Sequence, residues 1–197
     1  MKFSSSRTLI AGSLALASAT AHAHVGHGIS SFQAGLAHPL GLDHLLATLA
    51  VGVWSVRVLP VHRMWQGPAV FLLALLGSAC LGVVGVSLPH LESLISLSVV
   101  MFGLMLMYAH RQGRPGSGLV LIATAAILHG LAHGSEARGT PFASYASGFL
   151  LTTAALHASG MALAIAVQQG LTRHQARMTR ISGLLCGAAG FYFWSQV

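Results

Sequence analysis

Apolar and polar residues alternate in long blocks along this chain. Apolar runs, separated by charged residues or by Pro and Gly, cover residues 29–56, 68–86, 91–108, 118–131, 142–167 and 181–194. Some runs approach the roughly twenty residues that a helix needs to cross a bilayer, and polar residues facing the protein interior are expected to complete the two shorter runs. The pattern predicts an all-α membrane protein with six transmembrane helices.

Composition agrees with this fold class. The 197 residues are 54% hydrophobic and 7% charged, whereas about a quarter of the residues in a soluble domain are charged. The net charge of +7 comes from ten Lys and Arg residues against three acidic residues. These few bases lie between apolar runs, so they do not indicate a nucleic-acid surface and fit better as signals of membrane topology.

Charge placement tests the number of helices independently. Alternate connections between the predicted helices carry most of the basic residues, namely Arg57, Arg63, Arg111, Arg114, Arg173, Arg177 and Arg180. The connections on the other side carry Arg138. By the positive-inside rule, this distribution favours six helices with both ends of the mature chain in the periplasm of a bacterium.

The N-terminus has the features of a secretory signal. Lys2 and Arg7 precede an apolar stretch over residues 9–19, and Ala21-His22-Ala23 matches an A-x-A cleavage site. We therefore expect a cleavable signal peptide and insertion of the mature chain into the bacterial inner membrane.

Cleavage would divide the chain into a signal peptide, residues 1–23, and a transmembrane domain, residues 24–197. His24 and His27 would then lie at the mature N-terminus. They form either a weak periplasmic metal-capture site or an ordinary solvated end of the chain.

The end of the fourth apolar run carries three potential metal ligands. His129, His133 and Glu136 share one face at helical spacing. Imidazole and carboxylate together suit divalent first-row metals, and a carboxylate beside a bilayer is costly unless it has a partner. These residues therefore indicate a metal site.

A second polar group lies within the first apolar run, where His38, Asp43 and His44 follow one another. Pro39 and Gly41 are expected to make the helix start late or break, because proline removes a backbone donor. The first helix would run inward and the fourth outward, so both groups would lie in the outer half of the membrane. We expect them to converge on one cation site.

Other side chains allow more than one interpretation. His157 lies deeper, in the fifth predicted helix, and three roles are open for it: a further station on a metal path, a proton acceptor, or a structural histidine. Met101 and Met105 either offer thioether contacts or simply pack. Cys80 and Cys186 lie singly in apolar runs, so neither a disulfide nor a thiolate metal site is indicated.

Residues 38–47, 51–54 and 129–136 resemble the two motifs of the HupE/UreJ family of nickel or cobalt permeases. The resemblance implies a signal peptide, six spans and import of Ni²⁺ or Co²⁺, often in support of hydrogenase or urease maturation. It also implies a set of functional positions, which are His38, Asp43, His44, His129, His133 and Glu136. The stretch between His38 and Asp43 is one residue shorter here than in that family's motif.

The sequence contains neither a P-loop nor a Gly-rich phosphate turn, so the chain offers no ATP-driven step of its own. We expect a secondary transporter rather than an enzyme, with the metal ion as its substrate and no prosthetic group. Ligand type does not distinguish Ni²⁺ from Co²⁺.

Two other functions stay open at this point. The same polar residues could hold Zn²⁺ in an intramembrane hydrolase, although the sequence has no HExxH motif. A metal-sensing accessory membrane protein would make use of His24 and His27.

Overall fold

The structure, a computed structural model, describes residues 31–111, 115–137 and 141–197. These residues form seven α-helices: α2 (Phe32–Ala37), α3 (Leu42–Val58), α4 (Gln66–Val83), α5 (Leu91–Met107), α6 (Pro115–Glu136), α7 (Phe142–Gly170) and α8 (Gln175–Trp194). Three short 3₁₀ turns join them: η1 (His38–Leu40), η2 (Val61–Arg63) and η3 (Ala109–Arg111). The predicted all-α class is confirmed. The predicted signal peptide, His24 and His27 lie outside the described residues.

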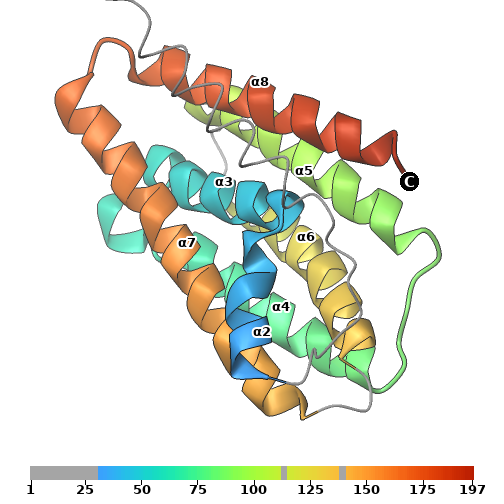
Figure 1. Ribbon diagram of the computed structural model, residues 1–197. Helices are drawn as coiled ribbons and strands as arrows, with labels where there is room; N and C mark the ends of the chain where they lie inside the picture. Colours follow the sequence, from blue (N-terminus) through green and yellow to red (C-terminus); the bar gives the residue numbers. More distant parts are fainter. Residues whose placement is uncertain (1–30, 112–114, 138–140) are drawn as a thin grey trace, which may run out of the picture.

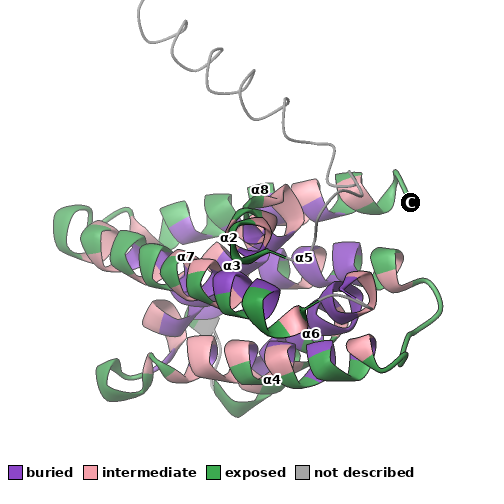
Figure 2. Ribbon diagram, turned by 60° about the horizontal axis from the view of Figure 1, so that its bottom comes forward, coloured by how far each residue is buried: buried purple, intermediate pink, exposed green. Residues whose placement is uncertain are grey.

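The helices pack in pairs around α3. Helix α7 lies against α2 and α3, α4 lies against α6, and α5 lies against α8 (Figure 1). Helix α3 contacts every other long helix, and Val51 and Trp54 on it are almost completely buried. Buried residues gather on the inward faces of the helices and exposed residues on the outward faces (Figure 2). The outward faces carry many large apolar side chains, as expected for a protein that faces lipid.

Three segments are long and apolar enough to cross a bilayer, namely residues 61–83, α6 and α7. Residues 32–58 form a fourth candidate span if their two helices, which are bent by 75°, count as one. Helix α5 is apolar but has 17 residues. The chain therefore has three to four candidate spans among the described residues, and the count of six stays a prediction.

The first apolar run is not one continuous helix. Helix α2 ends at Ala37, and Pro39 occupies the first turn of η1. Gly41 then precedes α3 with an extended backbone. A break, one of the two predicted effects of Pro39 and Gly41, is confirmed, and whether residues 29–56 form one span is left open by the bend. Proline causes the break because its ring clashes with the preceding helical turn and it has no N–H to donate.

Helix α6 is longer than the predicted run over 118–131. It continues to Glu136, so the helix includes the whole polar motif at its end. Apolar periodicity underestimates it because histidine and glycine interrupt the run without interrupting the helix.

Glycines set how closely α4 and α6 approach. A Cβ atom at Gly130 would collide with the Ser78 hydroxyl and the Leu75 carbonyl of α4. A Cβ at Gly82 would lie 2.5 Å from the Leu131 carbonyl oxygen of α6. Close backbone approach through small residues is the usual way in which helices associate in lipid. It holds the polar end of α6 in place.

The α3–α4, α5–α6 and α7–α8 connections meet at one end of the bundle. The Arg57 guanidinium at the end of α3 donates to the Gln175 side-chain oxygen at the start of α8, at 2.7 Å. The Arg180 guanidinium of α8 lies 2.6 Å from the His110 ring in η3. The ends of α3 and α5 and the start of α8 therefore share one side of the molecule.

We predict that Gly130→Ala lowers the stability of the fold by about 1–3 kcal/mol, because the added methyl group overpacks the α4–α6 contact. Gly77→Ala is the matched control on α4, since its Cβ meets no described atom within 4 Å. The measurement is the midpoint of thermal unfolding in detergent. Equal midpoints for the two variants would show that the close approach of α4 and α6 is not needed.

Candidate metal centre

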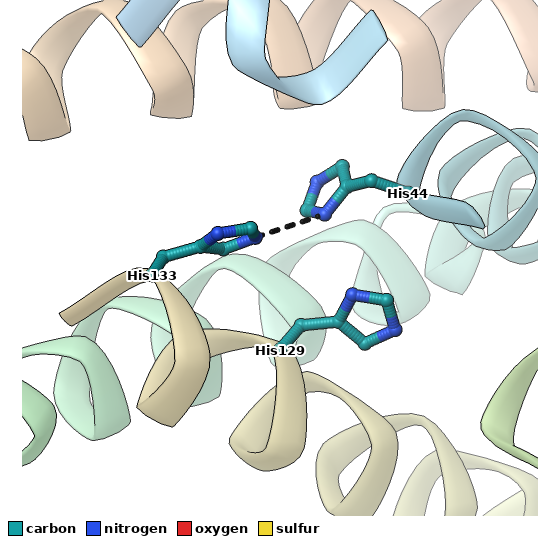
Figure 3. Close-up of side chains that lie close together, drawn as sticks. All are labelled: His44, His129 and His133. Carbon is teal, nitrogen blue, oxygen red and sulfur yellow. Dashed lines mark hydrogen bonds between the residues drawn. The ribbon is translucent and has the colours of Figure 1, made fainter. Parts of the chain in front are cut away.

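Three elements position the polar residues of the two motifs. His38 lies in η1, His44 lies in the first turns of α3, and His129, His133 and Glu136 lie in the last two turns of α6. The rings of His44, His129 and His133 point toward one another across the space between α3 and α6 (Figure 3). The predicted common face of α6 is thus present, and the break before α3 brings the two motifs together.

The inner group consists of His44, His129 and His133. Each offers a ring nitrogen, and these atoms lie within 4.8 Å of one another. The Nδ1 atom of His44 lies 3.3 Å from Nε2 of His133. The three residues are 2%, 1% and 7% exposed, respectively. A buried set of imidazoles with this spacing could hold a divalent first-row metal ion after small movements.

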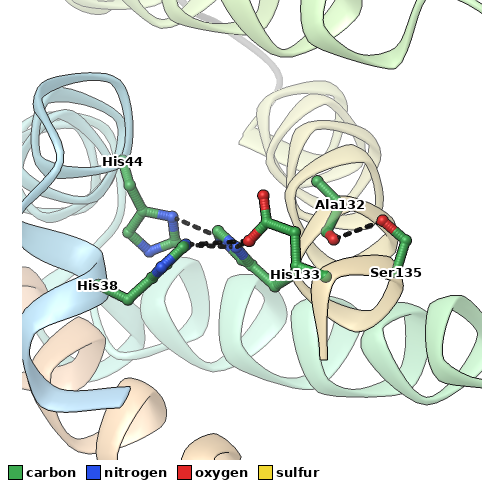
Figure 4. A network of polar contacts seen from close by, with 6 residues as sticks. His38, His44, Ala132, His133 and Ser135 are labelled. Atoms are coloured by element: carbon green, nitrogen blue, oxygen red, sulfur yellow. Dashed lines mark hydrogen bonds and ion pairs between the residues drawn. The ribbon is translucent and has the colours of Figure 1, made fainter. Parts of the chain in front are cut away.

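The outer group consists of His38, His133 and Glu136, whose ligand atoms also lie within 4.8 Å of one another. The Nε2 atom of His38 lies 2.8 Å from Nδ1 of His133 and 3.8 Å from a carboxylate oxygen of Glu136. The His38 and Glu136 side chains are 27% and 29% exposed. His133 lies between His38 and His44 in a line of contacts (Figure 4). His133 belongs to both groups.

Two hydroxyl groups support the inner imidazoles. The Thr153 hydroxyl of α7 lies 3.2 Å from Nε2 of His44. The Ser98 hydroxyl of α5 lies 3.1 Å from Nε2 of His129. Contacts of this kind orient metal ligands in many proteins. Sequence reasoning did not single out Ser98 or Thr153, because hydroxyl residues are common in apolar helices and their spacing carries no ligand signal.

Asp43 lies in the first turn of α3 and is half-buried. Among the described residues it belongs to neither group of candidate ligands. It is close enough to His129 for an electrostatic interaction, and its charge suits the positive end of the α3 dipole. The structure therefore brings five of the six predicted residues together, in two overlapping groups, with Asp43 beside them.

His157 lies further along α7 than the residues that contact the two groups. It is 1% exposed, and its ring centroid is 5.0 Å from that of Phe71. The Phe71 ring also lies 6.1 Å from the His44 ring. Neither nitrogen of His157 makes a well-formed hydrogen bond with the described residues, although the backbone of Thr153 lies nearby. Its predicted greater depth in the membrane stays a prediction.

The sulfur-containing side chains lie apart from the candidate ligands. Met105 is part of the hydrophobic core, and Met101 packs against it, which favours the packing interpretation for both. Cys186 is buried in the same core, whereas Cys80 is exposed. Both cysteines are free thiols.

Comparisons with known proteins cover most of the chain. The family model described as "HupE / UreJ protein" matches residues 12–193. Protein HupE from Rhizobium leguminosarum bv. viciae is 40% identical over 166 residues, which is 83% of this chain and 85% of the relative. No solved structure matches. Because the two matches extend over nearly the whole sequence, this membrane protein belongs to the HupE/UreJ family.

Proposed function

We propose that this protein is a permease that imports Ni²⁺ or Co²⁺ across the inner membrane. The observation that carries the proposal is the gathering of imidazole and carboxylate groups inside an apolar helical bundle, where uncompensated polar groups are costly. Membership of the HupE/UreJ family supports it. The proposed metal-binding residues are His38, Asp43, His44, His129, His133 and Glu136.

The difference in exposure between the two groups indicates the direction in which the metal ion would move. The outer group is accessible through His38 and Glu136, whereas the inner group is buried. An ion would exchange part of its water shell for these ligands and then pass inward toward His157. His24 and His27, near the mature N-terminus, would collect metal before it reaches the outer group.

The proposed topology has six spans, a removed signal peptide over residues 1–23, and both mature ends in the periplasm. The meeting of three connections at one end of the bundle supports it, because basic residues flank each of them. Helices α3 to α8 would then supply the six spans.

The ion is the substrate in this proposal and not a resident cofactor. The absence of a nucleotide-binding motif from the sequence favours facilitated or ion-coupled transport. Delivery to a nickel enzyme such as a hydrogenase or urease is the proposed physiological role.

Uptake of radiolabelled Ni²⁺ by cells without other nickel importers tests this function. We expect uptake by the wild type and a loss of more than about tenfold in Asp43→Asn, His129→Ala and His133→Ala at equal membrane abundance, because each removes a ligand or its charge partner. Competition by unlabelled Co²⁺, Zn²⁺ and Cu²⁺ ranks the metals. His62→Ala is the control, because His62 is exposed in η2.

An abundant wild type without uptake would contradict the proposal. Metal binding without flux in liposomes would instead favour a metal sensor. Zn²⁺-dependent cleavage of a lipid or peptide by the purified protein would favour the hydrolase.

Labelling of single cysteines by an impermeant thiol reagent tests the topology. With Cys80 and Cys186 replaced, we expect cysteines at His62 and His174 to react from the cytoplasmic side and a cysteine at Leu88 to react from the periplasmic side. Reaction of His62→Cys and Leu88→Cys from the same side would contradict six spans, since α4 would then not cross the membrane.

A further inference from the structure

The two ring nitrogens of His133 face different groups. Its Nδ1 atom lies 2.8 Å from Nε2 of His38 and 4.0 Å from a carboxylate oxygen of Glu136. Its Nε2 atom lies 3.3 Å from Nδ1 of His44. One imidazole therefore offers one nitrogen to the outer group and the other nitrogen to the inner group.

A threonine hydroxyl determines where the protons lie in this row of rings. The Thr153 hydroxyl donates its single proton to the Phe149 carbonyl oxygen at 2.8 Å. Its oxygen can then only accept from Nε2–H of His44. Nδ1 of the neutral His44 ring is left without a proton, so it accepts from Nε2–H of His133.

This assignment leaves a lone pair on Nδ1 of His133. Nδ1 accepts a hydrogen bond from Nε2–H of His38. In the neutral, metal-free site, the nitrogen of His133 that is ready to bind a metal ion is therefore the one that faces His38 and Glu136. The hydrogen-bond directions therefore prepare His133 for an ion in the outer group, whereas His38 has to move its proton from Nε2 before that nitrogen can bind the ion.

In the inner group, hydrogen bonds likewise leave the Nδ1 atoms of His44 and His129 free of protons. The Ser98 hydroxyl donates to the Ile95 carbonyl oxygen at 2.6 Å, so it accepts from Nε2–H of His129. Nδ1 of His129 and Nδ1 of His44 then both carry lone pairs. His133 is the one residue of the inner group whose proton blocks the inner position.

We propose that the outer and inner groups are two metal stations that share His133 and cannot be filled at the same time. A neutral imidazole has one lone pair in the ring plane, so His133 serves either station but not both. Two divalent ions on opposite sides of one ring would also repel each other strongly. This inference rests on the proposed function, and it makes His133 the residue that passes a single ion inward.

Transfer from the outer to the inner station requires a change of tautomer. The bond between the ion and Nδ1 breaks, and a bond between the ion and Nε2 forms. Nε2 loses its proton to water and Nδ1 takes one proton from water, so the ring stays neutral and no net proton is released. The ion keeps its charge throughout, and no oxidant or reductant takes part.

Co²⁺ binding to the purified protein in detergent tests the shared ligand, because the absorption bands of bound Co²⁺ report its coordination. We expect one bound ion per chain in a His24→Ala, His27→Ala background, which removes the proposed metal-capture site near the mature N-terminus. A variant with His38→Ala and Glu136→Gln keeps the inner station, and His44→Ala keeps the outer station. Each should bind one ion with a different spectrum, whereas His133→Ala should weaken binding by more than about tenfold.

Two bound ions per chain in the His24→Ala, His27→Ala background would overturn the inference. The absence of any bound ion there, or equal spectra of the two single-station variants, would also overturn it. Uptake and binding separate the inference from the proposed function. One bound ion without uptake would refute the transporter and keep the shared ligand. Uptake with two bound ions would support the transporter and refute the shared ligand.

NMR of isotope-labelled histidine ring nitrogens in the metal-free protein tests the proton positions directly. We expect His44 and His133 to carry their protons on Nε2. Thr153→Val should produce a mixture of tautomers at His44, and Thr153→Ser should restore the single form. Ser159→Ala removes an exposed hydroxyl of α7 and is the control. A proton on Nδ1 of His133 in the wild type would contradict the assignment.

Discussion

An imidazole buried among apolar helices is costly unless its nitrogens find partners, and the arrangement of the two groups of candidate ligands depends on meeting that requirement. His38, His133 and His44 bond to one another in a row, and the row ends at the Thr153 hydroxyl. Glycines let the helices that carry the row approach their neighbours closely: Gly130 of α6 lies against α4, and Gly52 of α3 lies against the backbone of α7. Helix packing and polar contacts therefore support the same site.

Much of this site could be predicted from residue spacing. Helical periodicity places His129, His133 and Glu136 on one face, provided that the helix continues to Glu136. Pro39 predicts the break that allows His38 to reach His133. The division into two groups could not be predicted, because it depends on which ring nitrogen faces which neighbour. The supporting role of Thr153 was equally hidden, since many hydroxyl groups in apolar helices only bond to their own backbone carbonyls.

The number of membrane crossings was less predictable than the grouping of the polar residues. Hydropathy identifies apolar runs, but a bend of 75° divides the first run, and α5 has 17 residues. Deeper in the bundle, His157 is buried beside Phe71 without a well-formed hydrogen bond to the described residues. An imidazole in such a position is costly to bury, and its role as a station on a metal path stays a prediction.

X-ray absorption at the nickel edge of the Ni²⁺-loaded protein tests the central claim most directly, because it detects imidazole ligands around the ion. The account predicts scattering from several imidazole rings in the wild type and in His62→Ala, and a clear loss of it in His133→Ala. A nickel shell made of oxygen alone, or an imidazole signal that His133→Ala leaves unchanged, would contradict the proposed metal centre.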